Sequence, residues 1–164
     1  TYLNVFFDDP EFSRNFSNLY NEIRWSPLPW FDLEFDTQIP LFEDSNFLEV
    51  ATTGTVMPTE NIEMSLRYRY LNYHPILRDS NRIELELYSR LSEKWGIGTE
   101  HRWEIEDGTL ELQAYSLYYD FDSWVGSVGF FHRDNSIEDD YGLLLSLGLK
   151  EIPKLSLPVR IGTE

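Results

Sequence analysis

Apolar and polar residues alternate with a period of two along most of the chain, from Leu19 to Leu149. In the stretch 82–91, isoleucine and leucine alternate with charged residues. Successive side chains of a strand point to opposite faces, so this pattern predicts a strand with one apolar and one charged face. The chain shows no convincing helix. The predicted strands are 1–7, 17–26, 30–40, 46–57, 60–72, 81–91, 94–105, 109–119, 123–133 and 140–149.

Length and composition limit the classes of protein. The 164 residues contain no Pro/Gly/Ser-rich linker, so we expect one domain, with barrel strands over 1–150 and a C-terminal periplasmic tail over 151–164. The net charge of −16 argues against a nucleic-acid partner. No apolar run reaches the ~18–20 residues of a transmembrane helix, so any spanning element must be a strand. The chain starts in a strand-like run without a signal peptide, and we expect a mature or truncated form.

Short and long connections between the predicted strands mostly alternate. Tight connections are predicted at 26–29, 58–59, 92–93 and 120–122. Longer polar connections are predicted at 8–16, 41–45, 73–80 and 134–139, and the short turn 106–108 is the exception. This alternation is typical of an antiparallel up-and-down transmembrane β-barrel with short periplasmic turns and longer outer loops.

Four tryptophans lie beside the predicted tight turns, and only Trp103 lies near an opposite end. Amphipathic rings prefer the headgroup level of a bilayer, so these residues are candidates for the aromatic girdle of a membrane barrel. A preference of tryptophan for strand ends and core corners is the other interpretation. The candidate girdle residues are Trp25, Trp30, Trp95 and Trp124.

Periodicity alone does not say which face meets water, because a soluble lipocalin-like barrel with an apolar interior has the same pattern. The alternating loop lengths and the tryptophans favour the membrane arrangement. So does the last predicted strand, in which a polar residue precedes Gly142 by two positions and Leu145 and Leu147 follow. This order is similar to the β-signal by which outer-membrane barrels are recognised by the barrel-assembly machinery.

The chain also resembles a known family in its later strands. The runs EKWGIG (93–98), LELQAYSLYYDFDSW (110–124) and VGFFHR (128–133), followed by 142–149, resemble the C-terminal strands of the LPS-assembly protein of the outer membrane, LptD. The hairpin at 19–27 is similar as well. The cysteines of some members and the N-terminal periplasmic domain are absent from this sequence, and the family's barrel has more strands than are predicted here. The resemblance implies the C-terminal part of a larger barrel.

The resemblance implies transport of lipopolysaccharide into the outer leaflet of the bacterial outer membrane rather than catalysis. The partners implied are lipopolysaccharide, outer-membrane lipids, a plug lipoprotein and periplasmic LPS-bridge proteins. A lateral gap between the first and last strands is part of the implied mechanism, so Gly142, Leu145 and Leu147 on strand 140–149 would lie at this seam.

The charged face would then line the lumen, because a Lys or Arg at the bilayer midplane costs ~2–4 kcal/mol. A hydrophilic passage for a glycolipid head or a plug, and a packed internal salt-bridge network, are equally compatible with these charges. The candidate lumen-facing residues are Glu63, Arg67, Arg69, Arg82, Glu84, Glu86, Glu100, Arg102 and Glu104.

The sequence contains no pattern that predicts an enzyme, a cofactor or a metal site. The three histidines, His74, His101 and His132, lie on separate segments without metal-ligand spacing. Acidic runs such as 138–140 lack the spacing of an EF-hand, although Ca²⁺ could be held by such oxygen ligands. Two alternatives stay open: a complete small outer-membrane barrel (a porin, an adhesin or a barrel hydrolase), and a soluble ligand-binding barrel.

Overall fold

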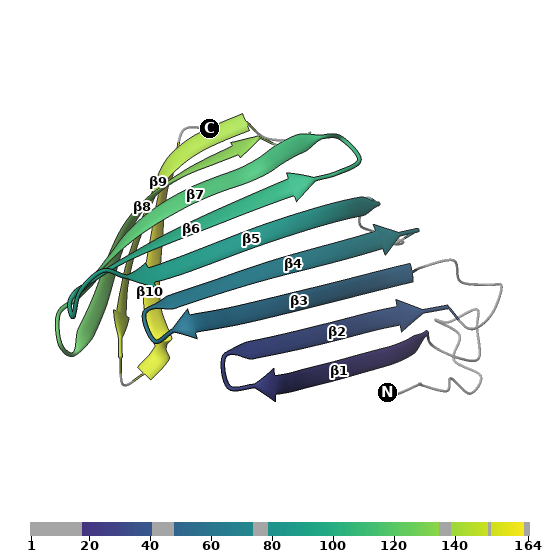
Figure 1. The fold of residues 1–164 in the computed structure, drawn as a ribbon. Coiled ribbons are helices and arrows are strands. Elements are labelled where there is room, and N and C mark those ends of the chain that lie inside the picture. Colours follow the sequence, from purple (N-terminus) through teal and green to yellow (C-terminus); the bar gives the residue numbers. More distant parts are fainter. Residues whose placement is uncertain (1–17, 41–47, 74–78, 135–138, 151, 163–164) are drawn as a thin grey trace, which may run out of the picture.

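The computed structural model describes residues 18–40, 48–73, 79–134, 139–150 and 152–162, and for the last range only the backbone. These residues form one sheet in which antiparallel strands follow one another in chain order (Figure 1). The strands are β1 (Leu19–Leu28), β2 (Phe31–Ile39), β3 (Leu48–Thr59), β4 (Ile62–Asn72), β5 (Ser80–Arg90), β6 (Trp95–Glu104), β7 (Thr109–Asp120), β8 (Trp124–Asp134), β9 (Asp139–Leu149) and β10 (Ile152–Gly162).

The all-β, up-and-down prediction is confirmed for β1–β9, whose bounds agree with the predicted strands within two residues. The predicted strand 1–7 lies outside the described residues. Strand β10 falls within the segment predicted to be a tail, so the expectation that 140–149 is the last strand is wrong. The sequence does not predict β10 because this segment contains two prolines, Pro153 and Pro158. The structure tolerates them because β10 is an edge strand that pairs only with β9, where a missing N–H costs least.

The register separates two faces. The apolar face includes the facing pair Leu66 and Leu85 and the residues aligned with them on the other strands. The polar face includes the neighbouring pair Arg67 and Glu84 and the residues aligned with these. Among the described residues of β1–β9, the apolar face has no Asp, Glu, Lys or Arg except the pair Asp134 and Asp139 at the strand ends. Alternation with a period of two therefore sorts nearly every charge onto one side of the sheet.

The sheet curls towards its polar face. Glu63 on β4 and Leu144 on β9 line one hollow, although five strand spacings of about 4.8 Å would separate them by about 24 Å in a flat sheet. Figure 1 shows β8, β9 and β10 turned behind the plane of β3–β6. The polar face is thus concave and the apolar face convex.

Small residues accompany the curl on the concave side of β7–β9. A Cβ at Gly129 would lie 2.7 Å from Ser116 Oγ and 2.9 Å from the carbonyl oxygen of Tyr115. The backbones of β7 and β8 approach each other here in a way that only glycine permits.

The sheet is open. No pairing joins β1 to β10 among the described residues, so both strands are edges and a closed barrel is not seen. The five connections at the β1–β2 end lie at 29–30, 60–61, 91–94, 121–123 and 150–151, and the opposite end has 40–47, 73–79, 105–108 and 135–138. We call these the tight-turn end and the long-connection end. Within the described residues, no helix is long and apolar enough to cross a membrane.

Candidate functional surfaces of the sheet

The centre of the polar face is a row of three paired side chains on β4, β5 and β6. Arg67, Glu84 and Arg102 are register partners across these strands. Glu84 lies 2.8 Å from the Arg102 guanidinium and 3.4 Å from that of Arg67, and its exposed fraction is only 8 %. Arg102 also reaches Glu100, at 3.0 Å. Opposite charges at directly facing positions stabilise a strand pair, so the row holds the three strands together.

A second group of polar contacts lies towards the long-connection end of the same face. Glu104 is buried, and its carboxylate accepts hydrogen bonds from Ser80 Oγ and from the backbone N–H of Asn81, both at 2.6 Å. Arg69 Nε donates to Glu49 at 2.8 Å. These bonds satisfy carboxylates that burial would otherwise penalise.

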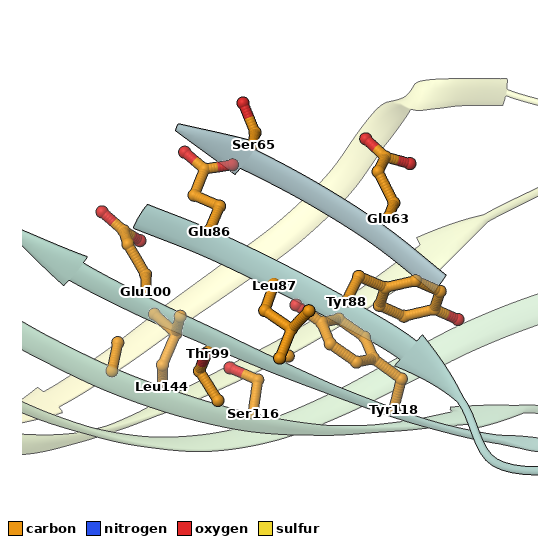
Figure 2. A pocket seen from close by; sticks show the side chains of 12 residues that line it. Glu63, Ser65, Glu86, Leu87, Tyr88, Thr99, Glu100, Ser116, Tyr118 and Leu144 are labelled. Atoms are coloured by element: carbon orange, nitrogen blue, oxygen red, sulfur yellow. The ribbon is translucent and has the colours of Figure 1, made fainter. Parts of the chain in front are cut away.

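The hollow on the polar face is built from charged and aromatic side chains of several strands (Figure 2). Its volume is ≈ 230 Å³. Tyr88 and Tyr118 lie beside each other with ring centroids 5.7 Å apart in an edge-to-face arrangement. Gly96 and Gly98 make room for them, because a Cβ there would lie 2.6 Å from Tyr88 Oη and 3.0 Å from Tyr118 Cε2. The polar lining includes Glu63, Ser65, Glu86, Glu100 and Ser116.

All nine residues proposed from the sequence to face a lumen share the polar face. The structure brings four of them, Arg67, Glu84, Glu100 and Arg102, into one ion-paired network. Glu63 and Glu86 line the hollow instead, and they have no ion pair within the described part of the chain. The paired and the unpaired carboxylates therefore occupy neighbouring parts of one concave surface.

The four candidate girdle tryptophans all lie at the tight-turn end. Trp25, Trp95 and Trp124 share the apolar face, Trp30 lies in the β1–β2 turn, and all four are exposed. Tyr119 packs edge-to-face on Trp95 with ring centroids 4.6 Å apart. Phe121 packs on Tyr119 at the same centroid distance. The sequence did not predict these two rings as part of the girdle, although Tyr119 precedes the predicted tight turn 120–122 and Phe121 lies within it.

Ionic contacts tie the tight turns to one another. Lys150 donates a hydrogen bond to the Asp120 carboxylate, and Lys94 lies 3.8 Å from Asp122. The hydrogen bond from Lys150 holds the pKa of the Asp120 carboxyl below its usual value. Asp120 is the last residue of β7, beyond the tyrosine that packs on Trp95.

The apolar face also has a polar interruption near the long-connection end. The register aligns His101, Gln113, His132 and Tyr141 across β6, β7, β8 and β9. His101 Nε2 lies 3.0 Å from Tyr115 Oη, and the His132 ring stacks on Tyr141 with centroids 4.2 Å apart and planes at 5°. We call these five residues the histidine row. The sequence does not predict this row, because its members come together only through the register of four strands.

The residues proposed as an assembly signal or lateral seam lie on β9, which pairs with β8 on one side and β10 on the other. Leu145 and Leu147 are on the apolar face and exposed, and Gly142 is on the polar face. A seam between first and last strands would therefore involve β10 rather than β9. In the part of the chain that the structure describes, no group of three or more His, Asp or Glu side chains is arranged to hold a metal ion.

Comparison with known proteins finds no family model, no curated protein and no solved structure that matches this chain.

Proposed function

We propose that this chain forms the membrane-spanning wall of a β-barrel in the bacterial outer membrane, with its apolar face towards lipid and its polar face towards a hydrophilic interior. One observation carries the proposal: the convex face is both exposed and almost free of charge. Ile23 and Leu66 are 56 % and 53 % exposed on this face, whereas Glu84 and Glu104 are buried on the other.

An exposed apolar face of this extent is energetically unfavourable for a folded protein in water. The largest exposed apolar patches of soluble monomers cover about 300–600 Å², and larger ones mark contact with lipid or protein. Here exposed large apolar side chains occur on each of the strands β1–β9 except β3. Conversely, each Lys or Arg on a lipid face costs ~2–4 kcal/mol at the midplane, which explains why the charges gather on the concave side.

The height of the apolar face fits a bilayer. Trp124 and His132 share this face of β8 and are eight residues apart (132 − 124 = 8), which is about 26 Å along a strand. A strand tilt of about 35–45° reduces this to about 19–22 Å along the membrane normal, close to the ~25 Å apolar band of outer-membrane barrels. Tryptophans bound the band at the tight-turn end.

The two open edges of the sheet, β1 and β10, need hydrogen-bonding partners in a membrane. A sheet inside a bilayer cannot leave an edge of unpaired N–H and C=O groups, so β1 and β10 must each find a partner in the closed barrel. Closure of β1 against β10 supplies these partners within this chain, and in a larger barrel neighbouring strands supply them.

The finer part of the proposal, transport of lipopolysaccharide, is supported by the resemblance of 93–149 to the LptD family and by the character of the concave face. Carboxylates, arginines and hydroxyls there suit the sugar and phosphate head of a glycolipid. A plug lipoprotein, periplasmic bridge proteins and the barrel-assembly machinery are the further partners that we propose on this basis.

The alternatives receive less support from the structure. A lipocalin-like barrel needs its apolar face concave, whereas here it is convex. A barrel hydrolase needs a serine hydroxyl beside a histidine. Among the described residues, His101 bonds to Tyr115 and His132 to Asp139.

Adjacent residues on opposite faces give a direct test of the wall. The full chain is folded into phospholipid vesicles, and its free energy of unfolding is measured by denaturant titration. Leu66→Arg should lower it by about 2–4 kcal/mol, and the matched control Ser65→Arg by less than about 0.5 kcal/mol. Equal effects, or a wild-type chain that stays monomeric in buffer without detergent, would show that the wall proposal is wrong.

The transport proposal needs a separate measurement. A photo-crosslinking residue at Ser116, in the hollow, should form adducts with lipopolysaccharide in cells, and the same probe at Leu117, on the apolar face, should react with phospholipid. If no lipopolysaccharide adduct forms at either site, the transport proposal is refuted, but the barrel-wall proposal is not.

A further inference from the structure

We propose that the histidine row is a contact site for the phosphate group of membrane lipids in the leaflet at the long-connection end. The proposal rests on the proposed function, because it needs the apolar face to meet lipid. It goes beyond that function by assigning a ligand chemistry to named side chains outside the barrel interior.

The position of the row supports this assignment. Within the described part of β4–β9, the apolar face is aliphatic or aromatic between the tight-turn end and the row, apart from a few small uncharged side chains such as Thr99 and Ser89. At the row, two imidazoles and one amide lie on three neighbouring strands. Unsatisfied polar groups in hydrocarbon cost several kcal/mol each, so the row belongs at the headgroup level. The spacing from Trp124 to His132 places the β8 end of the row at the opposite boundary from the girdle.

The chemistry of the row suits an anionic oxygen. The Gln113 amide has two donors, and His101 donates from Nδ1 when its Nε2 accepts the Tyr115 hydroxyl proton. The His132 Nε2–H donates to the Asp139 carboxylate, so the donors that the row offers to an anion are those of His101 and Gln113, with His132 beside them. The two tyrosines are exposed, so a ligand can approach.

The rings are held in place before a ligand arrives. His101 stacks on Trp103 with centroids 5.6 Å apart and planes at 20°, and its bond to Tyr115 fixes its orientation. His132 lies between Asp139, at 3.3 Å, and the face of Tyr141. Rings that are already ordered lose little entropy on binding, which favours a specific contact over a diffuse one.

A lipid phosphate is favoured over free phosphate by the surroundings. Phe130 and Leu143 are register partners next to the row towards the tight-turn end, and both are exposed. A ligand with acyl chains can cover these side chains while its phosphate reaches the imidazoles, whereas inorganic phosphate leaves them in water.

Histidine signals provide the test. The chain has three histidines, so selective ¹⁵N labelling of the full chain in a maltoside micelle yields three imidazole groups, assigned with His101→Gln and His132→Gln. Dihexanoyl phosphatidylglycerol, added at constant pH, should shift the His101 and His132 signals saturably. Gln113→Leu should weaken the apparent affinity about fivefold or more, since one hydrogen bond to a charged group is lost. The matched control Thr99→Ala, also on the apolar face of β6, should leave it unchanged.

Each other outcome overturns the proposal. No shift means that the row binds no phosphate, and equal shifts with inorganic phosphate mean a free-anion site instead. Equal shifts with hexyl maltoside, which lacks phosphate, mean acyl contact alone. Because these comparisons use the wild-type chain, they hold even if a variant fails to fold. A chain that inserts into vesicles but shows no shift contradicts only this inference, not the barrel wall.

Discussion

The carboxylate of Glu84 on β5 lies 2.8 Å from the guanidinium of Arg102 on β6, and the two residues face each other directly in the register. Arg67 completes the row from β4. The pair therefore lies at the centre of the concave face, where three strands share one buried carboxylate.

Replacing this carboxylate should weaken the sheet. Glu84→Gln removes the negative charge between two arginines and leaves Arg102 with weaker partners. We expect the free energy of unfolding to fall by about 1–3 kcal/mol, measured by denaturant titration in vesicles. Glu86→Gln is the matched control, because Glu86 lies on the same strand and face without an ion pair among the described residues, and it should change stability by less than about 0.5 kcal/mol. Equal losses would contradict the central role of the row.

The close approach of β7 and β8 predicts a strong cost for one added methyl group. Gly129→Ala brings a Cβ within 2.9 Å of a backbone carbonyl oxygen, which cannot move without distorting the ladder. We expect a destabilisation of about 1–3 kcal/mol by the same titration. Gly54→Ala, whose Cβ would meet only Leu33 Cδ1 at 3.9 Å, should be nearly neutral. A neutral Gly129→Ala would mean that the strands do not approach so closely.

The hydrogen bond between Lys150 and Asp120 predicts a pH effect. The pKa of Asp120 is lowered in the folded chain, so its contribution to stability is present above the unfolded pKa and is lost as the pH falls through the folded pKa. Lys150→Met should raise the pKa of Asp120 and reduce this acid-dependent loss, measured by carboxyl ¹³C titration. Lys94→Met, which removes the partner of Asp122 instead, should leave Asp120 titrating as before. An unchanged pKa in Lys150→Met would refute the contact.

The girdle predicts where tryptophan fluorescence is quenched. A variant that keeps Trp124 and replaces the other four tryptophans with phenylalanine should be quenched more strongly by lipids brominated near the headgroup than by lipids brominated near the chain end. A second variant that keeps only Trp103 should show the same preference, because Trp103 lies near the opposite boundary. Stronger quenching by lipids brominated near the chain end would show that the proposed membrane boundaries are wrong.

Strand positions were predictable because each strand has one apolar and one polar side, so local alternation fixes where it begins and ends. Strand β10 was not, because Pro153 and Pro158 each lack a backbone N–H and interrupt the pattern that marks a strand in the sequence. The network around Glu84 depends on register, and the bulge between Arg102 and Trp103 shows that register cannot be counted from residue number alone. Likewise, the pairing of Tyr88 with Tyr118 follows from two glycines on the strand between them.

Every described strand pairs only with the strands before and after it in the chain. The unit of construction is therefore the hairpin, and its neighbours depend on it only through one ladder on each side. A chain of this kind can lengthen its perimeter by gaining a hairpin, or shorten it by losing one, without rewiring the remaining strands. Its assembly can also proceed locally, one hairpin after another, because every ladder among the described strands joins neighbours in the chain.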